Sequence, residues 1–166
     1  MRNIDEKDRE ILSILENDAR ISTSDLAIMV ALPEQEVIRR MKELEQRGVI
    51  KKYRAIIDWE KVGVEKVTAV IDVKVTPERG KGYDSVAERV ANFPEVRTVY
   101  LVSGEYDLAV VVEGKTMKEV SLFVSEKLAP LERVHGTNTH FMLKKYKEEG
   151  IVVFEKEENK RLGISL

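Results

Sequence analysis

The spacing of apolar residues changes once along this chain, from a helical repeat to near-strict alternation, and the change divides the sequence into two parts. Val37, Met41 and Leu44 recur at the three- and four-residue intervals of a helix. From Val67 to Val75, apolar and polar residues largely alternate, as in a strand that buries one face. With 166 residues, the chain is long enough for two small domains. We therefore predict an α+β protein with a helical N-terminal domain and a mixed C-terminal domain.

The first 58 residues contain the start and stop signals of three short helices. Asp5 can cap the first helix, and Ser22, with an aspartate three residues later, has the pattern of a capping box. Pro33 stands at or beside the start of the third helix, where its missing N–H is tolerated. Gly48 follows the last apolar position, as a left-handed C-terminal cap does. Residues 49–57 then have the pattern of a short hairpin, which completes the order of a winged helix-turn-helix domain.

The second part contains six predicted elements in the order strand, helix, strand, strand, helix, strand. Pro94 and Pro130 each end a helix, and the residues around Gly104 join the two middle strands as a tight hairpin. This order is that of a ferredoxin-like βαββαβ sandwich, in which two helices back a four-stranded antiparallel sheet. The predicted elements cover residues 67–75, 83–93, 96–102, 106–112, 117–128 and 134–143.

These patterns also place the domain boundaries. We expect the DNA-binding domain over residues 1–58, a linker over 59–66 and the sandwich over 67–145. Residues 146–166 form a charged extension with an apolar island at 151–154. The extension is either an extra edge strand followed by a short helix, or a loosely held tail.

Positive charge gathers at the third helix and the segment after it. Residues 37–54 contain seven Lys or Arg residues and only two Glu, a local excess suited to phosphate. A recognition helix in the major groove would present its outward side chains to base edges, and the hairpin cations would bind phosphate. A solvated helix face, or a three-helix module that never contacts DNA, would have the same charge pattern. The predicted DNA-binding residues are Gln35, Ile38, Arg39, Arg40 and Lys42 on the helix, and Lys51, Lys52 and Arg54 after it.

The order and spacing of several short motifs resemble those of the Lrp/AsnC family of leucine-responsive, or feast/famine, regulators. The resemblance extends over roughly residues 3–145. The matching motifs are Ile4-Asp5-x-x-Asp8-x-x-Ile11-Leu12, Ala19-Arg20-Ile21-Ser22, Asp25-Leu26-Ala27, Val37-x-x-Arg40-Met41-x-x-Leu44-Glu45-x-x-Gly48-Val49-Ile50, Gly104-Glu105-Tyr106-Asp107-Leu108 and Val134-x-x-Thr137-x-Thr139.

This resemblance implies a transcriptional regulator whose sandwich domain, of the RAM type, pairs into homodimers and higher assemblies and binds an amino acid or related metabolite between dimers. The effector residues it implies are Gly104, Tyr106 and Asp107 in the hairpin loop, with Thr137 and Thr139 on the last strand. Asp107 would pair with an ammonium group, while loop N–H groups and hydroxyls would hold a carboxylate. The alternative is that Gly104 only makes the turn and Asp107 only caps it.

The chain departs from the family pattern in two places. Ala31-Leu32-Pro33 stands where the family usually has Gly-Leu-Ser, so a residue with a Cβ enters a turn that favours positive φ, and a capping hydroxyl is lost. The two glutamates that follow, Glu34 and Glu36, weaken non-specific attraction to DNA. The tail beyond Lys145 is longer than the pattern and is a candidate to alter oligomer size.

Composition limits the other function classes. Without cysteine, the chain has no disulfide, thiolate metal site or cysteine nucleophile, and we expect neither metal nor cofactor. Neither a leader nor an apolar run of membrane-spanning length is present, so we expect a cytoplasmic protein. The charged fraction of 35% is typical of thermophilic or archaeal proteins. The rival functions are a siroheme decarboxylase-like enzyme, for which His135 and His140 are the only imidazoles, and a metabolite-binding module without DNA binding.

Overall fold

The computed structural model describes residues 3–153, and the chain divides into two compact units, residues 1–56 and 57–166. Each unit has its own hydrophobic core. Among residues 3–153, no helix combines the length and the apolar character needed to span a membrane.

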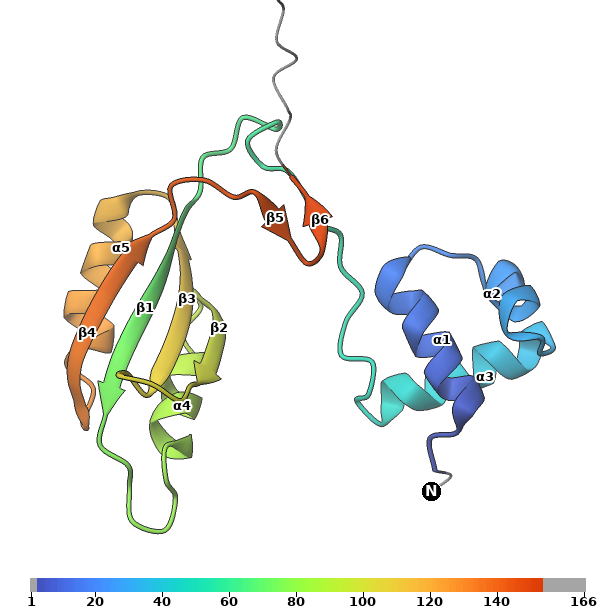
Figure 1. Ribbon diagram of the computed structural model, residues 1–166, viewed down its shortest axis with the longest axis horizontal. Coiled ribbons are helices and arrows are strands. Elements are labelled where there is room, and N and C mark those ends of the chain that lie inside the picture. Colours follow the sequence, from blue (N-terminus) through green and yellow to red (C-terminus); the bar gives the residue numbers. More distant parts are fainter. Residues whose placement is uncertain (1–2, 154–166) are drawn as a thin grey trace, which may run out of the picture. The chain divides into compact units, whose positions relative to one another are not determined.

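The N-terminal unit is a bundle of three short helices, α1 (Glu6–Asn17), α2 (Thr23–Val30) and α3 (Glu34–Gln46) (Figure 1). Their apolar stripes meet in a core whose fully buried members are Ile11, Leu26, Val30 and Val37. Each such side chain contributes about 1.5–3 kcal/mol by leaving water. The apolar residues that recur at helical spacing in the sequence are therefore the ones that pack in this core.

Side chains cap the first two helices as predicted, with one difference in detail. The Asp5 carboxylate accepts from the backbone N–H of Asp8 at 2.9 Å, and the Asp8 carboxylate accepts from the N–H of Asp5 at 3.0 Å. Ser22 accepts from the N–H of Asp25 at 3.0 Å. The Asp25 carboxylate binds the Ser22 hydroxyl at 2.6 Å, so the second capping box is not of the expected form.

The predicted wing hairpin does not form in this chain. Gly48 has the expected left-handed φ of 65°, but residues 51–58 contain no strand in the part of the chain that the structure describes. Lys51, Lys52 and Arg54 are exposed along this extended segment. The hairpin prediction was wrong because alternating sequence indicates an extended segment but does not supply a second strand for it to pair with.

The C-terminal unit is the predicted βαββαβ sandwich (Figure 1). Its sheet is antiparallel and has the strand order β2-β3-β1-β4. The helices α4 and α5 pack on one face, over a core in which Ile71 and Val110 are paired and fully buried. The elements are β1 (Val67–Val75), α4 (Asp84–Ala91), β2 (Val96–Leu101), β3 (Leu108–Gly114), α5 (Met117–Phe123), a π-helical continuation η1 (Val124–Leu128) and β4 (Val134–Phe141).

No helix among residues 3–153 lies over the opposite face of this sheet (Figure 1). Cross-strand pairing aligns Thr98, Val111, Val70 and His140 in one row, and the next row contains Asp72. Val70 and Val111 are half-buried, and a half-exposed His140 imidazole contacts the Asp72 carboxylate at 2.9 Å. We call this side the open sheet face.

The extension beyond Lys145 begins as a separate two-stranded hairpin, β5 (Lys147–Glu148) and β6 (Ile151–Val152). Its turn residues Glu149 and Gly150 both have positive φ, the geometry of a tight type I′ connection. The hairpin does not join the edge of the four-stranded sheet, so the first of the two alternatives, an extra edge strand, does not hold for the described residues. The expected terminal helix lies outside the described residues.

Candidate DNA interface and candidate effector site

One exposed stripe runs along α3. Gln35, Ile38, Arg39 and Lys42 are all exposed, and their spacing of three and four residues places them on one side of the helix. Val37 and Leu44 are buried on the other side. The exposed stripe can enter a groove with amide, guanidinium and ammonium donors and one apolar side chain.

Arg39 lies on this stripe but is paired within its own helix. Its guanidinium donates to Glu36 at 2.7 and 2.9 Å and to Glu43 at 3.3 Å. The hydrogen bonds from Arg39, and then from Arg40, hold the pKa of Glu36 at about 2, so the carboxylate stays charged. Exposed pairs of this kind are weak, because water competes for both partners. Arg39 can therefore exchange Glu36 for a base edge at little cost.

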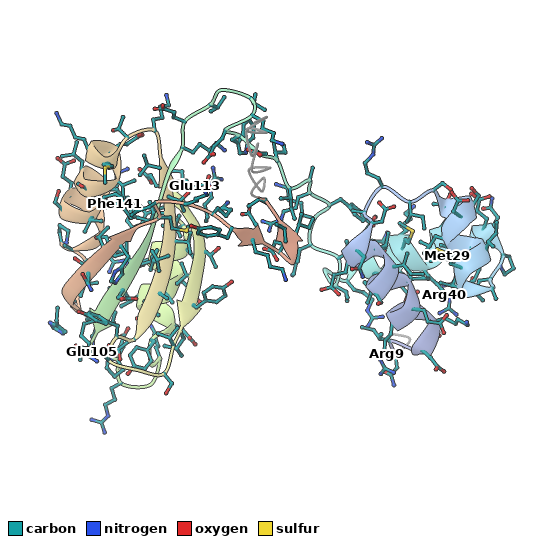
Figure 2. All side chains as sticks on the ribbon, turned by 45° about the horizontal axis from the view of Figure 1, so that its top comes forward. Arg9, Met29, Arg40, Glu105, Glu113 and Phe141 are labelled. Atoms are coloured by element: carbon teal, nitrogen blue, oxygen red, sulfur yellow. The ribbon has the colours of Figure 1, made fainter. Side chains whose placement is uncertain are left out.

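Arg40, the next residue, faces inward. Its side chain is only 12% exposed and donates to Asp5 at 2.8 Å, to Asp8 at 3.0 Å and to Glu36 at 2.7 Å. Asp8 is fully buried. The cluster fastens α3 to the start of α1 within the N-terminal unit, where Figure 2 labels Arg40. The structure thus corrects the prediction for Arg40: this guanidinium is held by carboxylates and is not part of the exposed stripe.

The turn between α2 and α3 has the strain that the sequence indicates. Ala31 has φ 52° and ψ 50°, the left-handed region in which a Cβ is unfavourable. Pro33 is the N-cap of α3 and offers no capping side chain, while Thr23 donates its hydroxyl to Glu34 at 2.6 Å. Glu34 is thereby tied to the first turn of α2.

Replacing Ala31 with glycine is expected to raise the free energy of unfolding by about 0.5–1 kcal/mol, because the relief of left-handed strain exceeds the added entropy of the unfolded chain. Urea unfolding followed by circular dichroism measures the change. Ala27→Gly, in the interior of α2, is the control and should lower the stability by about 1 kcal/mol. A destabilised Ala31→Gly protein would contradict the prediction.

The effector residues implied by the family resemblance do not form one cluster within the chain. Gly104, Tyr106 and Asp107 lie in the β2–β3 loop, at the end of the sheet that Figure 2 marks by Glu105. Thr137 and Thr139 lie on β4, which the sheet order separates from β3 by β1. Both threonines are half-buried.

The Asp107 carboxylate is held by its own domain. It accepts from the backbone N–H of Val75 at 2.9 Å and lies 3.5 Å from the Lys74 ammonium, which also donates to the Glu105 carbonyl at 2.6 Å. Tyr83 approaches the second carboxylate oxygen at 3.4 Å. These contacts, the Val75 N–H first, hold the pKa of Asp107 below its ordinary value. Lys74 is not among the predicted site residues, although its position on the wetter face of the first strand was a usable signal.

Comparison with known proteins agrees with this architecture. A winged helix-turn-helix DNA-binding model matches residues 4–51, and the Lrp/AsnC ligand binding domain matches residues 68–152. The HTH-type transcriptional regulator YugG of Bacillus subtilis is 50% identical over 161 residues, 96% of this chain and 97% of that protein. An HTH-type transcriptional regulator of Pyrococcus horikoshii is 35% identical over 145 residues, 87% of this chain and 93% of that protein.

Two solved structures of regulators bound to L-methionine have the same fold. The regulator from Neisseria meningitidis matches with a TM-score of 0.68 and 28% identity, over 88% of this chain and 94% of that chain. The feast or famine regulatory protein of Mycobacterium tuberculosis matches with a TM-score of 0.70 and 25% identity, over 88% and 96%.

The two matched domains define a transcriptional regulator with a DNA-binding helix-turn-helix and a ligand-binding sandwich. The chain belongs to the Lrp/AsnC family, which confirms the resemblance seen in its motifs. The family consists of regulators and not of enzymes, so the siroheme decarboxylase alternative is set aside.

Proposed function

We propose that this regulator binds operator DNA as a homodimer through the exposed stripe of α3, and that an amino-acid-like effector changes its assembly or its DNA affinity. The observation that carries the DNA half is the alignment of Gln35, Ile38, Arg39 and Lys42 on the exposed side of α3. The same proposal places the protein in the cytoplasm, with the DNA that it binds.

The stripe and the segment after it have different roles in this proposal. Gln35 matches the donor and acceptor pattern of adenine, Arg39 that of guanine, and Ile38 can contact a thymine methyl group. Lys51, Lys52 and Arg54 contact phosphate, which fixes position and not sequence. Arg40 is left out because its partners are carboxylates of its own domain.

The first test is selection of retained sequences from random duplex DNA at two salt concentrations. An imperfect palindrome, with half-sites a whole number of about 10 bp turns apart, is expected because a dimer presents two recognition helices. Retention that lacks a motif and disappears at moderate salt would leave only a charge-driven binder. No retention at low salt would favour the metabolite-binding module.

The open sheet face supports the dimer. Val70 and Val111 form an apolar centre that no helix of the described residues covers, and an apolar sheet face of this kind favours association. Val111→Glu is expected to convert the dimer to a monomer, because a two-fold axis brings two buried carboxylates into one interface. Light scattering after gel filtration measures the mass. Met117→Glu, on the exposed side of α5, is the control and should leave the dimer intact.

The effector proposal rests on family membership and on the two methionine complexes. We place the effector at the β2–β3 loop, with Gly104, Tyr106 and Asp107. Thr137 and Thr139 are separated from that loop within one chain, so a second subunit would bring the two sets together. A thermal-shift panel of the twenty amino acids tests this. We expect one chemical group of amino acids to raise the Tm of the wild-type protein and not that of the Tyr106→Ala variant. If no amino acid shifts the Tm, the effector proposal is contradicted.

A further inference from the structure

One acidic side chain lies at the start of the exposed stripe of α3. Glu34 is the first residue of the helix after the N-cap Pro33, and it is exposed. Ile38 follows it by four residues, so the two side chains lie on the same side of the helix, one turn apart. Recognition helices contact base edges with their N-terminal residues. Glu34 therefore lies at the end of the stripe that would be closest to the bases.

The Glu34 carboxylate is held from outside its own helix. The hydroxyl of Thr23, the first residue of α2, donates to its Oε1 at 2.6 Å. Within the described part of the chain, no Lys or Arg pairs with this carboxylate, and its Oε2 accepts no hydrogen bond. Glu36, two residues later, is instead paired with both Arg39 and Arg40. Glu34 thus combines a preferred direction with an oxygen that is available to a ligand.

The chemistry of a carboxylate limits which base edge it can bind. An ionised carboxylate only accepts hydrogen bonds. In the major groove, guanine presents two acceptors, thymine an acceptor and a methyl group, and adenine an acceptor beside its amino group. Cytosine presents only the donor of its N4 amino group. Cytosine is therefore the base that Glu34 can bind without facing another acceptor.

The same carboxylate acts against other contacts at the start of this helix. Its negative charge repels phosphate, and it occupies the Thr23 hydroxyl, which is a donor of the kind that binds phosphate oxygens. Opposite guanine or thymine it would lose water without gaining a hydrogen bond, which costs free energy. Specificity is a difference between affinities, so these unfavourable contacts contribute to it together with the favourable one.

We propose that Glu34 selects a cytosine in each half-site of the operator, through a hydrogen bond from the N4 amino group to its Oε2, and that Thr23 positions the carboxylate for this contact. The inference rests on the proposed binding of operator DNA through α3. It adds a base and a residue that the proposed contacts of Gln35, Ile38 and Arg39 do not include. Thr23 is a positioning residue, which acts through Glu34 and touches no base.

Selection from random duplex DNA with the full-length protein tests the base contact. The wild-type motif should contain one cytosine in each half-site that is preferred over the other bases by about fivefold or more, the lower end of what a direct base contact contributes. Glu34→Ala should reduce this preference to about twofold or less and leave the other positions unchanged. Glu34→Gln should shift the preference to adenine, because the amide can bind N6 and N7 together.

The matched control is Glu45→Ala, which removes the same charge from an exposed position near the other end of α3. It should leave every base preference unchanged. Glu34→Ala should also strengthen binding to a scrambled duplex by about threefold at low salt, since a charge that repels phosphate is removed.

Two variants of Thr23 test the positioning role. Thr23→Val keeps the shape of the side chain without the hydroxyl, so the cytosine preference should fall by about threefold, as for the loss of one hydrogen bond. Thr23→Ser keeps the donor and should keep the preference. Urea unfolding of both variants shows that a changed preference is not a loss of fold.

The outcomes separate this inference from the proposed function. A wild-type motif whose base preferences are all unchanged in Glu34→Ala would overturn the inference and leave operator binding intact. A preference that depends on Glu34 but is for another base would overturn the choice of cytosine. If the wild-type protein selects no motif, both the inference and the proposed function fail. If Thr23→Val keeps the full cytosine preference, Thr23 does not position Glu34.

Discussion

Replacing Arg40 with alanine is expected to lower the free energy of unfolding of the N-terminal domain by about 3–5 kcal/mol. The change leaves Asp8, which is fully buried, without the guanidinium that lies 3.0 Å away. Removing the cationic partner of a buried carboxylate costs this much because the attraction to that partner is lost while the desolvation of the carboxylate remains. Since small domains are stable by only about 5–15 kcal/mol, the domain would be partly unfolded near its working temperature. Urea unfolding followed by circular dichroism measures the loss.

The neighbouring arginine supplies the matched control. Arg39→Ala removes the same group one position away, but from an exposed pair, and should change the stability by less than about 1 kcal/mol. If the two variants lose equal amounts of stability, the contacts of Arg40 with Asp5 and Asp8 do not stabilise the packing of α3 against α1.

The pH dependence of stability provides a second measurement on this cluster. The pKa of Glu36 is lowered from 4.5 to about 2 by its hydrogen bonds to Arg39 and then Arg40. A lowered folded-state pKa stabilises the domain above the unfolded value of 4.5, and this contribution is lost as pH falls toward 2. We therefore expect stability to fall over that interval, with a smaller fall in Arg40→Ala. An equally steep fall in the variant would contradict this role.

Arg39→Ala is expected to weaken binding to the selected operator by about 1–3 kcal/mol, while its binding to random DNA changes little. A guanidinium that contacts guanine through two donors carries this much discrimination, and the arginine leaves Glu36 and Glu43 to make that contact. Titration of labelled operator and of a scrambled duplex at one salt concentration gives both values.

Lys51→Ala distinguishes a base contact from a phosphate contact. It should weaken binding to the operator and to the scrambled duplex about equally, and reduce the salt dependence by about one unit of slope. If Arg39→Ala gives the same uniform loss as Lys51→Ala, then Arg39 is a phosphate contact and specificity lies elsewhere on α3.

Several local features followed from the sequence because neighbours in the chain decide them. The caps of Asp5 and Ser22 formed, since each acceptor lies three residues from its donor. The left-handed turn at Ala31 and the cap at Gly48 also formed where the pattern indicates them. The βαββαβ order is confirmed, because alternating and helical repeats differ enough to be distinguished in single elements.

The predicted sites depended more on distant residues. The wing hairpin needed a second strand, and the extension formed a sheet of its own where an added edge strand was one of two alternatives. The threonines of β4 lie in the predicted strand, but the sheet order separates them from the loop of Gly104. A sequence pattern identifies a strand and its faces, and it does not state which strands become neighbours.

The sequence by itself determined the class of the protein, its two-domain order and the helix on which we propose the DNA-binding side chains, because these depend on repeats and caps a few residues long. Only the tertiary structure separated Arg39 from Arg40, which are adjacent in the chain. Arg40 turns inward because Asp5 and Asp8, 35 and 32 residues earlier, lie where α1 meets α3. Asp107 is likewise held by Lys74 and Val75, from a strand more than thirty residues away. The partner of a charged side chain is set by packing, because carboxylates and cations pair with whatever the fold brings within reach.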